Sequence, residues 1–201
     1  MKYVLGLVLV AASFLFSFAP NCGLIYDGGM YASLAYSLYK NQEYVCNGAT
    51  GDLPPVFPLL LAFSLFFGER GVNYVTPIFT MLLVTAALLF LRNENRAIYA
   101  FLGSLILLFH PSIFEYSITI ARDVPVLFFT LTCYLIYENN KKEVSPISSA
   151  LLGVFMALAF LSTYSALIYL LPIFIHAALN RKKSILQAIA VAVILIFPWA
   201  A

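Results

Sequence analysis

Long apolar runs separated by short polar breaks dominate this chain. Roughly 20 apolar residues cross the hydrocarbon core of a bilayer, and slightly shorter runs suffice when flanking side chains reach the interface. The pattern therefore predicts an all-α protein, a polytopic transmembrane helical bundle that forms a single domain over residues 1–201. We expect about seven spans, at residues 3–19, 74–91, 97–114, 124–137, 147–161, 166–179 and 184–199.

Two apolar stretches differ from the length of a single span. Residues 55–67 are too short to cross readily, so they fit a re-entrant or interfacial helix better than a span. Residues 147–179 are the opposite case, because one helix of that length would extend about 50 Å at 1.5 Å per residue. The polar residues 162–165 interrupt this run, and two spans joined by a tight outer turn fit better.

The distribution of basic residues indicates which loops face the cytoplasm. With residues 55–67 not crossing and the N-terminus retained and cytoplasmic, eight of the eleven lysines and arginines lie inside. This agrees with the excess of Lys and Arg in cytoplasmic loops of membrane proteins. Residues 20–73 and 115–123 then form the two main outer segments, which hold six of the nine acids: Asp27, Glu43, Asp52, Glu69, Glu115 and Asp123. Chemistry is expected on this outer face.

The first outer segment begins with an acid followed by two glycines, Asp27, Gly28 and Gly29. Beyond them an apolar face recurs with helical spacing and predicts a helix along the membrane surface, through Tyr31, Leu34, Ala35 and Leu38. The glycines allow a tight turn at its start. Asp27 is then either a helix cap or a functional acid, because ionisable groups at a membrane boundary are candidates for function.

Aromatic and basic side chains surround this acid. Five tyrosines cluster here, and they either form an interfacial belt or supply one or two rings that line a groove: Tyr26, Tyr31, Tyr36, Tyr39 and Tyr44. Cys22 and Cys46 also flank the segment and could form a disulfide in an oxidising compartment or remain free.

The second outer segment ends in Arg122 and Asp123, directly before a predicted span. Asp123 could pair with Arg122, cap the following helix, or line a site together with Asp27. The chain has only two histidines, His110 and His176, and no histidine cluster suited to a metal.

Composition supports the membrane assignment and excludes one class of partner. The chain is 63% hydrophobic and 10% charged, with a mean hydropathy of +0.95, which is outside the range of soluble domains. Its net charge of +2 is small and its basic residues are scattered, so nucleic acid is not an expected partner.

Several segments, taken in order, resemble the N-terminal half of the polytopic GT-C glycosyltransferases. This superfamily includes the protein O-mannosyltransferases and the lipid A aminoarabinose transferases. The resemblance rests on the Asp-Gly-Gly-Met-Tyr segment after the first span, on residues 53–62 with their paired prolines and on residues 121–129. One position departs from the protein O-mannosyltransferases, which have a second acid where this chain has Gly28.

The resemblance implies an inverting membrane glycosyltransferase that works at the outer face of the cell membrane. It would transfer a sugar from a polyprenyl-phosphate donor to an acceptor hydroxyl, without a metal or other cofactor. Asp27 matches the acid that interacts with the acceptor, and Asp123 matches the acid of the second outer loop. Candidate substrate-binding residues are Tyr31, Lys40, Arg70 and Arg122, with Arg122 the first choice for stabilising the leaving phosphate.

Two expectations concern the protein as a whole. Family members continue beyond the Pro-Trp at residues 198–199 with a basic residue and further spans, so we expect a second half or a partner subunit. The alternative function is a non-catalytic membrane subunit or carrier protein whose outer loops bind a partner. A transporter fits less well, because transporters place polar groups near the bilayer midplane, whereas the charges here lie at the ends of the apolar runs.

Overall fold

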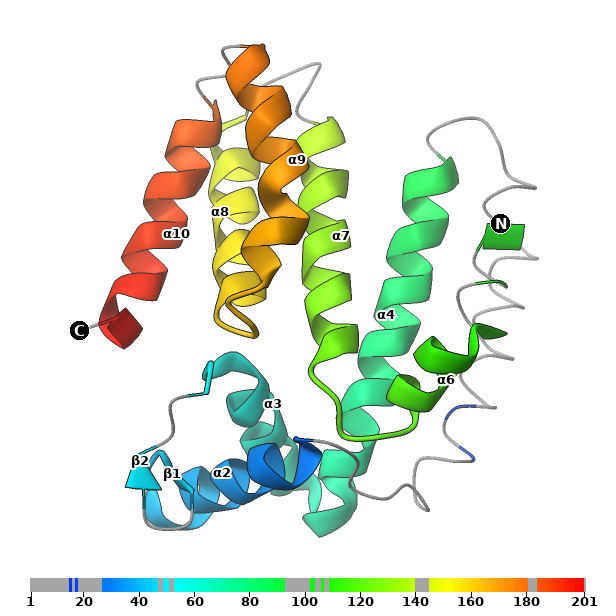
Figure 1. Ribbon diagram of the computed structural model, residues 1–201, viewed down its shortest axis with the longest axis vertical. Helices are drawn as coiled ribbons and strands as arrows, with labels where there is room; N and C mark the ends of the chain where they lie inside the picture. The colour runs from blue at the N-terminus through cyan, green and yellow to red at the C-terminus, as the bar shows by residue number, and fades with distance from the viewer. Residues whose placement is uncertain are drawn as a thin grey trace. The chain divides into compact units, whose positions relative to one another are not determined.

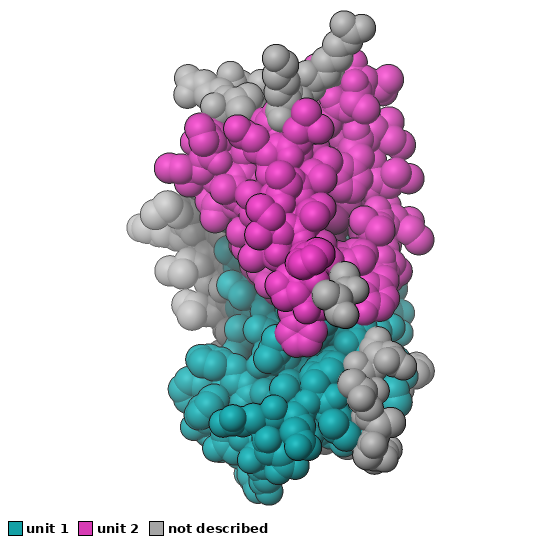
Figure 2. Space-filling view, turned by 90° about the vertical axis from the view of Figure 1, so that its left-hand side faces the viewer, with its two compact units in different colours: residues 1–125 teal, residues 126–201 magenta. Residues whose placement is uncertain are grey.

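The computed structural model describes residues 15, 17, 27–46, 49–50, 53–92, 102–103, 106, 109–139, 145–180 and 184–200, and the described chain is mainly helical (Figure 1). The chain divides into two compact units, Met1–Pro125 and Val126–Ala201 (Figure 2). The expected all-α class is confirmed. Span 3–19 lies almost wholly outside the described residues, as does Cys22, while Cys46 carries a free thiol.

Unit 1 contains short helices followed by one long helix. In chain order, it comprises α2 (Gly28–Asn41), the strands β1 (Val45–Cys46) and β2 (Ala49–Thr50), α3 (Val56–Ser64), the 3-10 helices η2 (Leu65–Phe67) and η3 (Glu69–Gly71), α4 (Val72–Arg92) and α6 (Pro111–Ser117). The two strands form an antiparallel hairpin in which Val45 pairs with Thr50. The sequence did not predict this hairpin, because strands of two residues are too short to show an alternating pattern.

Helix α2 forms where its apolar spacing predicts a helix, but its apolar face does not lie on the membrane. Tyr31 and Ala35 are buried in one core cluster with Phe57 and Leu61 of α3. The rings of Tyr31 and Phe57 meet edge to face, with their centroids 5.2 Å apart. The expected contact with lipid is therefore wrong for this face, because a neighbouring apolar helix covers it.

Helix α4 spans 21 residues and confirms the helix expected at residues 74–91. At 1.5 Å per residue it extends about 32 Å, close to the thickness of a bilayer core. The segment Glu69–Phe90 is long and apolar enough to cross a membrane, and it alone meets that criterion in the described part of the chain. Four further apolar helices are shorter: Val56–Phe67, Pro146–Phe160, Ala166–Leu179 and Ser184–Trp199.

The span expected at residues 97–114 is not one continuous helix. His110 has an extended backbone, with φ −63° and ψ 124°, and a new helix, α6, begins at Pro111. Proline restricts the residue before it to extended conformations and is well tolerated at the first position of a helix. The outer segment that follows is therefore partly helical.

Unit 2 consists of helices packed side by side. They are α7 (Asp123–Asn139), which begins at the end of unit 1, α8 (Pro146–Phe160), α9 (Ala166–Leu179) and α10 (Ser184–Ala200) (Figure 1). Their bounds follow the helices expected at residues 124–137, 147–161, 166–179 and 184–199, and a turn separates α8 from α9. A hydrogen bond of 2.7 Å between the Tyr137 hydroxyl and Nδ1 of His176 links α7 to α9.

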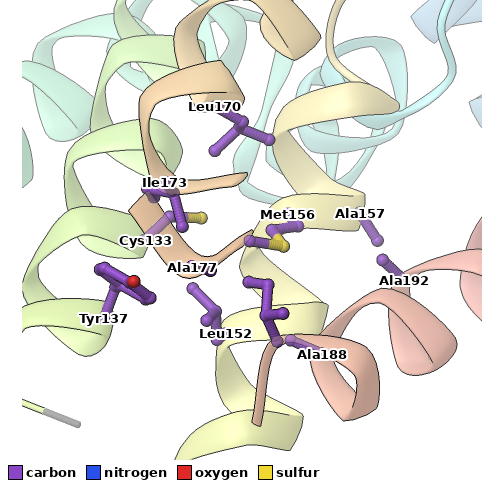
Figure 3. Close-up of a cluster of buried hydrophobic side chains, with 11 residues drawn as sticks. Cys133, Tyr137, Leu152, Met156, Ala157, Leu170, Ile173, Ala177, Ala188 and Ala192 are labelled. Carbon is purple, nitrogen blue, oxygen red and sulfur yellow. The ribbon is translucent and has the colours of Figure 1, made fainter. Parts of the chain in front are cut away.

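The core of unit 2 depends on small residues where α8 meets α10. Figure 3 shows Ala157 of α8 beside Ala192 of α10, with Met156 and Leu152 among the other buried side chains. A Cβ atom at Gly153 would lie 2.3 Å from the carbonyl oxygen of Ala188. Small residues at such a seam let two helix backbones approach closely, which favours helix association in membranes.

We expect Gly153→Val to destabilise unit 2, because the added carbons would force α8 and α10 apart. Overpacking of this kind costs about 1–3 kcal/mol. Thermal unfolding of the purified protein in detergent measures the effect as a lower Tm. Leu151→Val on the same helix is the control, because Leu151 is 47% exposed, and its Tm should stay near that of the wild type.

Candidate active site

A small pocket in unit 1 brings the two outer acids together. Its volume is about 80 Å³, and it is lined by Asp27, Gly28, Tyr31, Tyr116, Ile120, Ala121, Arg122 and Asp123. The first three residues belong to the start of α2, and the others come from α6 and the turn that leads into α7. Four of the six residues singled out from the sequence therefore line one pocket, although Tyr31 and Arg122 are 91 positions apart.

Asp27 occupies the position before the first residue of α2, yet its side chain does not cap the helix. Its backbone carbonyl accepts hydrogen bonds from the N–H groups of Met30 and Tyr31, at 3.0 and 3.1 Å. The side chain makes no capping hydrogen bond. The helix start is thus held by the backbone, and the carboxylate faces the pocket without being committed to the helix.

Asp123 is the first residue of α7 and not the residue before it. A negative charge in the first turn of a helix interacts favourably with the helix dipole, so Asp123 suits the start of α7. Asp123 lines the same pocket as Asp27.

Arg122 is the cation of the pocket, and Tyr31 holds it there. The Arg122 guanidinium donates a hydrogen bond from Nη1 to the Tyr31 hydroxyl, and its Cζ lies 5.6 Å from the centre of the Tyr31 ring. Tyr31 is in turn fixed, because it is only 1% exposed and packs on Phe57. A guanidinium has five N–H donors, so one bond to Tyr31 leaves others for a ligand.

The charges of the pocket also act on the phenol of Tyr31. Burial raises the pKa of Tyr31 above its ordinary value of 10.0, and the charges of Asp27 and Asp123 raise it further. The positive charge of Arg122 and its hydrogen bond lower the pKa, but the net shift is upward. Tyr31 is therefore protonated at neutral pH and serves as a positioning group, which leaves the carboxylates as the proton acceptors.

Gly28 lets the two halves of the pocket approach each other. A Cβ atom at this position would lie 2.6 Å from the carbonyl oxygen of Ile120, so any larger residue would push the second segment away. The expected role of Gly28 and Gly29 in a tight turn is wrong, because both residues belong to the first turn of α2. Among the described glycines, Gly68 is the one with a left-handed backbone, with φ 106°.

The structure separates the remaining candidates from this pocket and adds one residue to it. Lys40 lies in the last turn of α2, 5.7 Å from the centre of the Tyr36 ring, and Arg70 lies in η3; neither lines the pocket. Tyr116 of α6 lines it and was not a candidate. In the sequence, Pro111 predicts that a helix begins there, because proline is favoured at the first helical position. It does not predict that Tyr116 of this helix lines the pocket.

Two carboxylates, a guanidinium and a protonated phenol define what the pocket can do. An ionised carboxylate accepts a proton from a bound hydroxyl, and a guanidinium binds an anion such as a phosphate. At about 80 Å³, the pocket has room for a hydroxyl-bearing group and a few water molecules. Proton transfer from a hydroxyl beside an anionic group is the chemistry that suits it.

Comparison with known proteins identifies the family. No curated protein and no solved structure gives a significant match to the chain. Residues 52–201 match the family described as dolichyl-phosphate-mannose-protein mannosyltransferase, and this range includes Arg122 and Asp123 but not Asp27. Because the match covers most of the 201 residues, the chain belongs to this family of membrane-integral glycosyltransferases of the GT-C type.

Proposed function

We propose that the pocket around Asp27 is the acceptor side of a sugar-transfer site on the outer face of the membrane. The donor is a sugar linked to a polyprenyl phosphate, and the acceptor is a hydroxyl group. One observation carries the proposal: Asp27, whose carboxylate makes no capping bond, lines one pocket with Asp123 and Arg122. Family membership supports the class of reaction.

In the proposed reaction, the acceptor oxygen attacks the anomeric carbon of the sugar. The bond from that carbon to the phosphate oxygen breaks, and its electron pair leaves with the lipid phosphate. The carboxylate of Asp27 takes the proton of the acceptor hydroxyl as the new bond forms, which is general base catalysis. Attack from the face opposite the phosphate inverts the configuration at the anomeric carbon.

Arg122 is proposed to stabilise the departing phosphate. Its positive charge lies in a partly enclosed pocket, where a fixed cation stabilises developing negative charge more than water does. The hydrogen bond to the buried Tyr31 holds the guanidinium in place before the substrate arrives. Asp123, the next residue along the chain, lines the same pocket.

The same proposal includes the orientation of the chain. We propose a multi-pass protein of about seven spans with a cytoplasmic N-terminus, because this arrangement leaves six of the nine acids outside and most basic residues inside. Asp27→Cys and Glu94→Cys, each in a background without the native cysteines, test it with a membrane-impermeant thiol reagent on intact cells. We expect label at residue 27 and none at residue 94 until the cells are opened. Label at both positions before opening would contradict this orientation.

The transferase itself is tested by product analysis. Membranes carrying the protein, supplied with polyprenyl-phosphate sugars and hydroxyl acceptors, should form a glycoside whose anomeric configuration is opposite to that of the donor. Membranes without the protein are the control. If the protein is present and folded but no donor and acceptor pair yields product, the non-catalytic subunit becomes the better description.

We expect Arg122→Gln to reduce the turnover number by about 10²–10³-fold, the usual cost of removing one preorganised group that stabilises charge in the transition state. Arg122→Lys keeps the charge but lacks the planar guanidinium, so it should recover only part of the rate. Steady-state kinetics with the lipid-linked donor measure both variants. Equal rates for Gln and Lys would show that the charge of Arg122 does not contribute.

A further inference from the structure

We infer that an apolar groove between α3 and α4 holds an aliphatic chain of a phospholipid from the outer leaflet. The groove has a volume of about 550 Å³, within the range of about 300–1,000 Å³ typical of small-molecule sites. Its walls include Leu60, Phe63 and Phe67 on one side and Tyr74, Ile78 and Phe79 of α4 on the other. None of the residues that line it is charged.

The chemistry of the groove suits a hydrocarbon and not a polar ligand. Ser64 is the one hydroxyl contributed by α3, and it donates its proton to the carbonyl oxygen of Leu61 at 2.6 Å. The walls are held close together, because a Cβ atom at Gly71 would lie 2.1 Å from the carbonyl oxygen of Ser64. A ligand here would therefore gain affinity mainly by burying apolar surface.

Exposed aromatic rings surround the opening of the groove. Phe63, Phe66 and Phe67 are 63%, 72% and 79% exposed. The ring of Phe63 contacts the other two, with centroids 6.2 and 5.8 Å apart, and Tyr39 of α2 packs edge to face on Phe66. A contiguous exposed patch of this kind marks a surface that binds a partner or a membrane.

The position of the groove on α4 indicates which partner covers it. Ile78 lines the groove near the start of the helix that is long enough to cross a bilayer. Farther along the same helix, Leu82 and Leu89 are 41% and 49% exposed, so the groove continues into an apolar helix surface. In a membrane-integral family, a lipid chain is the partner that meets this surface along its length.

The groove is distinct from the pocket that contains Asp27. The two share no lining residue. Phe57 and Leu61 of α3 are buried in the core with Tyr31, whereas Phe63 and Phe67 of the same segment are exposed and line the groove. For this reason we assign the groove to a bilayer phospholipid and not to the lipid that carries the sugar.

A phospholipid with a photoreactive diazirine in its acyl chain tests the assignment. The full-length protein is reconstituted in vesicles of that lipid and illuminated, and labelled residues are located by mass spectrometry. In the wild type, label should concentrate on groove residues relative to exposed apolar residues of α10. Ile78→Trp, which puts a large ring at the groove, should reduce label on Phe63 and Phe67 to that background.

Ile168→Trp is the control, because Ile168 of α9 is also an exposed isoleucine, at 70%, and does not line the groove. Label in the groove should be unchanged in this variant. Uniform label over α4 and α10, or equal loss in both variants, would overturn the inference. So would a cross-link showing that another protein helix fills the groove. These readouts do not involve sugar transfer, so they stand apart from the test of the proposed function.

Discussion

Asp27→Asn is expected to reduce sugar transfer by about 10²–10⁴-fold, the usual contribution of a general base, while the amount of folded protein stays the same. Asparagine has nearly the same size as aspartate but cannot accept the proton of the acceptor hydroxyl. Folding should tolerate the change, because the Asp27 side chain does not cap α2 and the helix start is held by the backbone carbonyl. Transfer from a polyprenyl-phosphate sugar by membranes of equal protein content measures the effect.

Glu43→Gln is the control for this result. Glu43 is an exposed acid of the same outer segment and does not line the pocket, so its replacement removes one negative charge without touching the site. We expect wild-type transfer from this variant. If Asp27→Asn transfers sugar as fast as Glu43→Gln does, Asp27 is not the base.

Gly28→Ala is the second change with a large expected effect, and we expect it to reduce both stability and transfer by displacing part of the pocket. The added methyl group would lie 2.6 Å from the carbonyl oxygen of Ile120, so the second outer segment must move away from α2. Overpacking costs about 1–3 kcal/mol. Because Arg122 and Asp123 lie two and three residues after Ile120, we also expect a strong loss of transfer. Thermal unfolding and the transfer assay measure the two effects.

The neighbouring glycine supplies a matched control. Nothing lies within 4 Å of a Cβ atom at Gly29, and that residue also belongs to the first turn of α2. Gly29→Ala should therefore keep transfer and raise stability, by up to roughly 0.5–1 kcal/mol from the lower entropy of the unfolded chain and better helix propensity. Equal behaviour of the two alanine variants would contradict the close approach at Gly28.

Much of the helical fold could be predicted from hydrophobic periodicity. The helices α7 to α10 follow the apolar runs within one or two residues, because polar segments separate most of these runs along the chain. The failure at residues 97–114 has a local cause. The expected span runs across His110 and Pro111, although proline disfavours a helical conformation at the residue before it, and the chain breaks there.

The candidate site could be predicted in part. The acids and Arg122 stand out because charges are rare in this chain and lie at the ends of apolar runs. Tyr116 and the close approach at Gly28 could not be found this way, since they depend on which segments meet in space. Lys40 and Arg70 are candidates only because they are basic and lie in a predicted outer segment. Neither property indicates how far a side chain lies from the pocket, and neither residue lines it.

The nine residues of α3 connect the two surfaces proposed above. Phe57 supports Tyr31, which holds Arg122 in the pocket, while Leu60 and Phe63 of the same helix line the groove. A displacement of α3 on the groove side would therefore reach Tyr31 and Arg122 through a single short helix. If both proposals hold, bilayer thickness and acyl-chain saturation are variables to control when sugar transfer is measured.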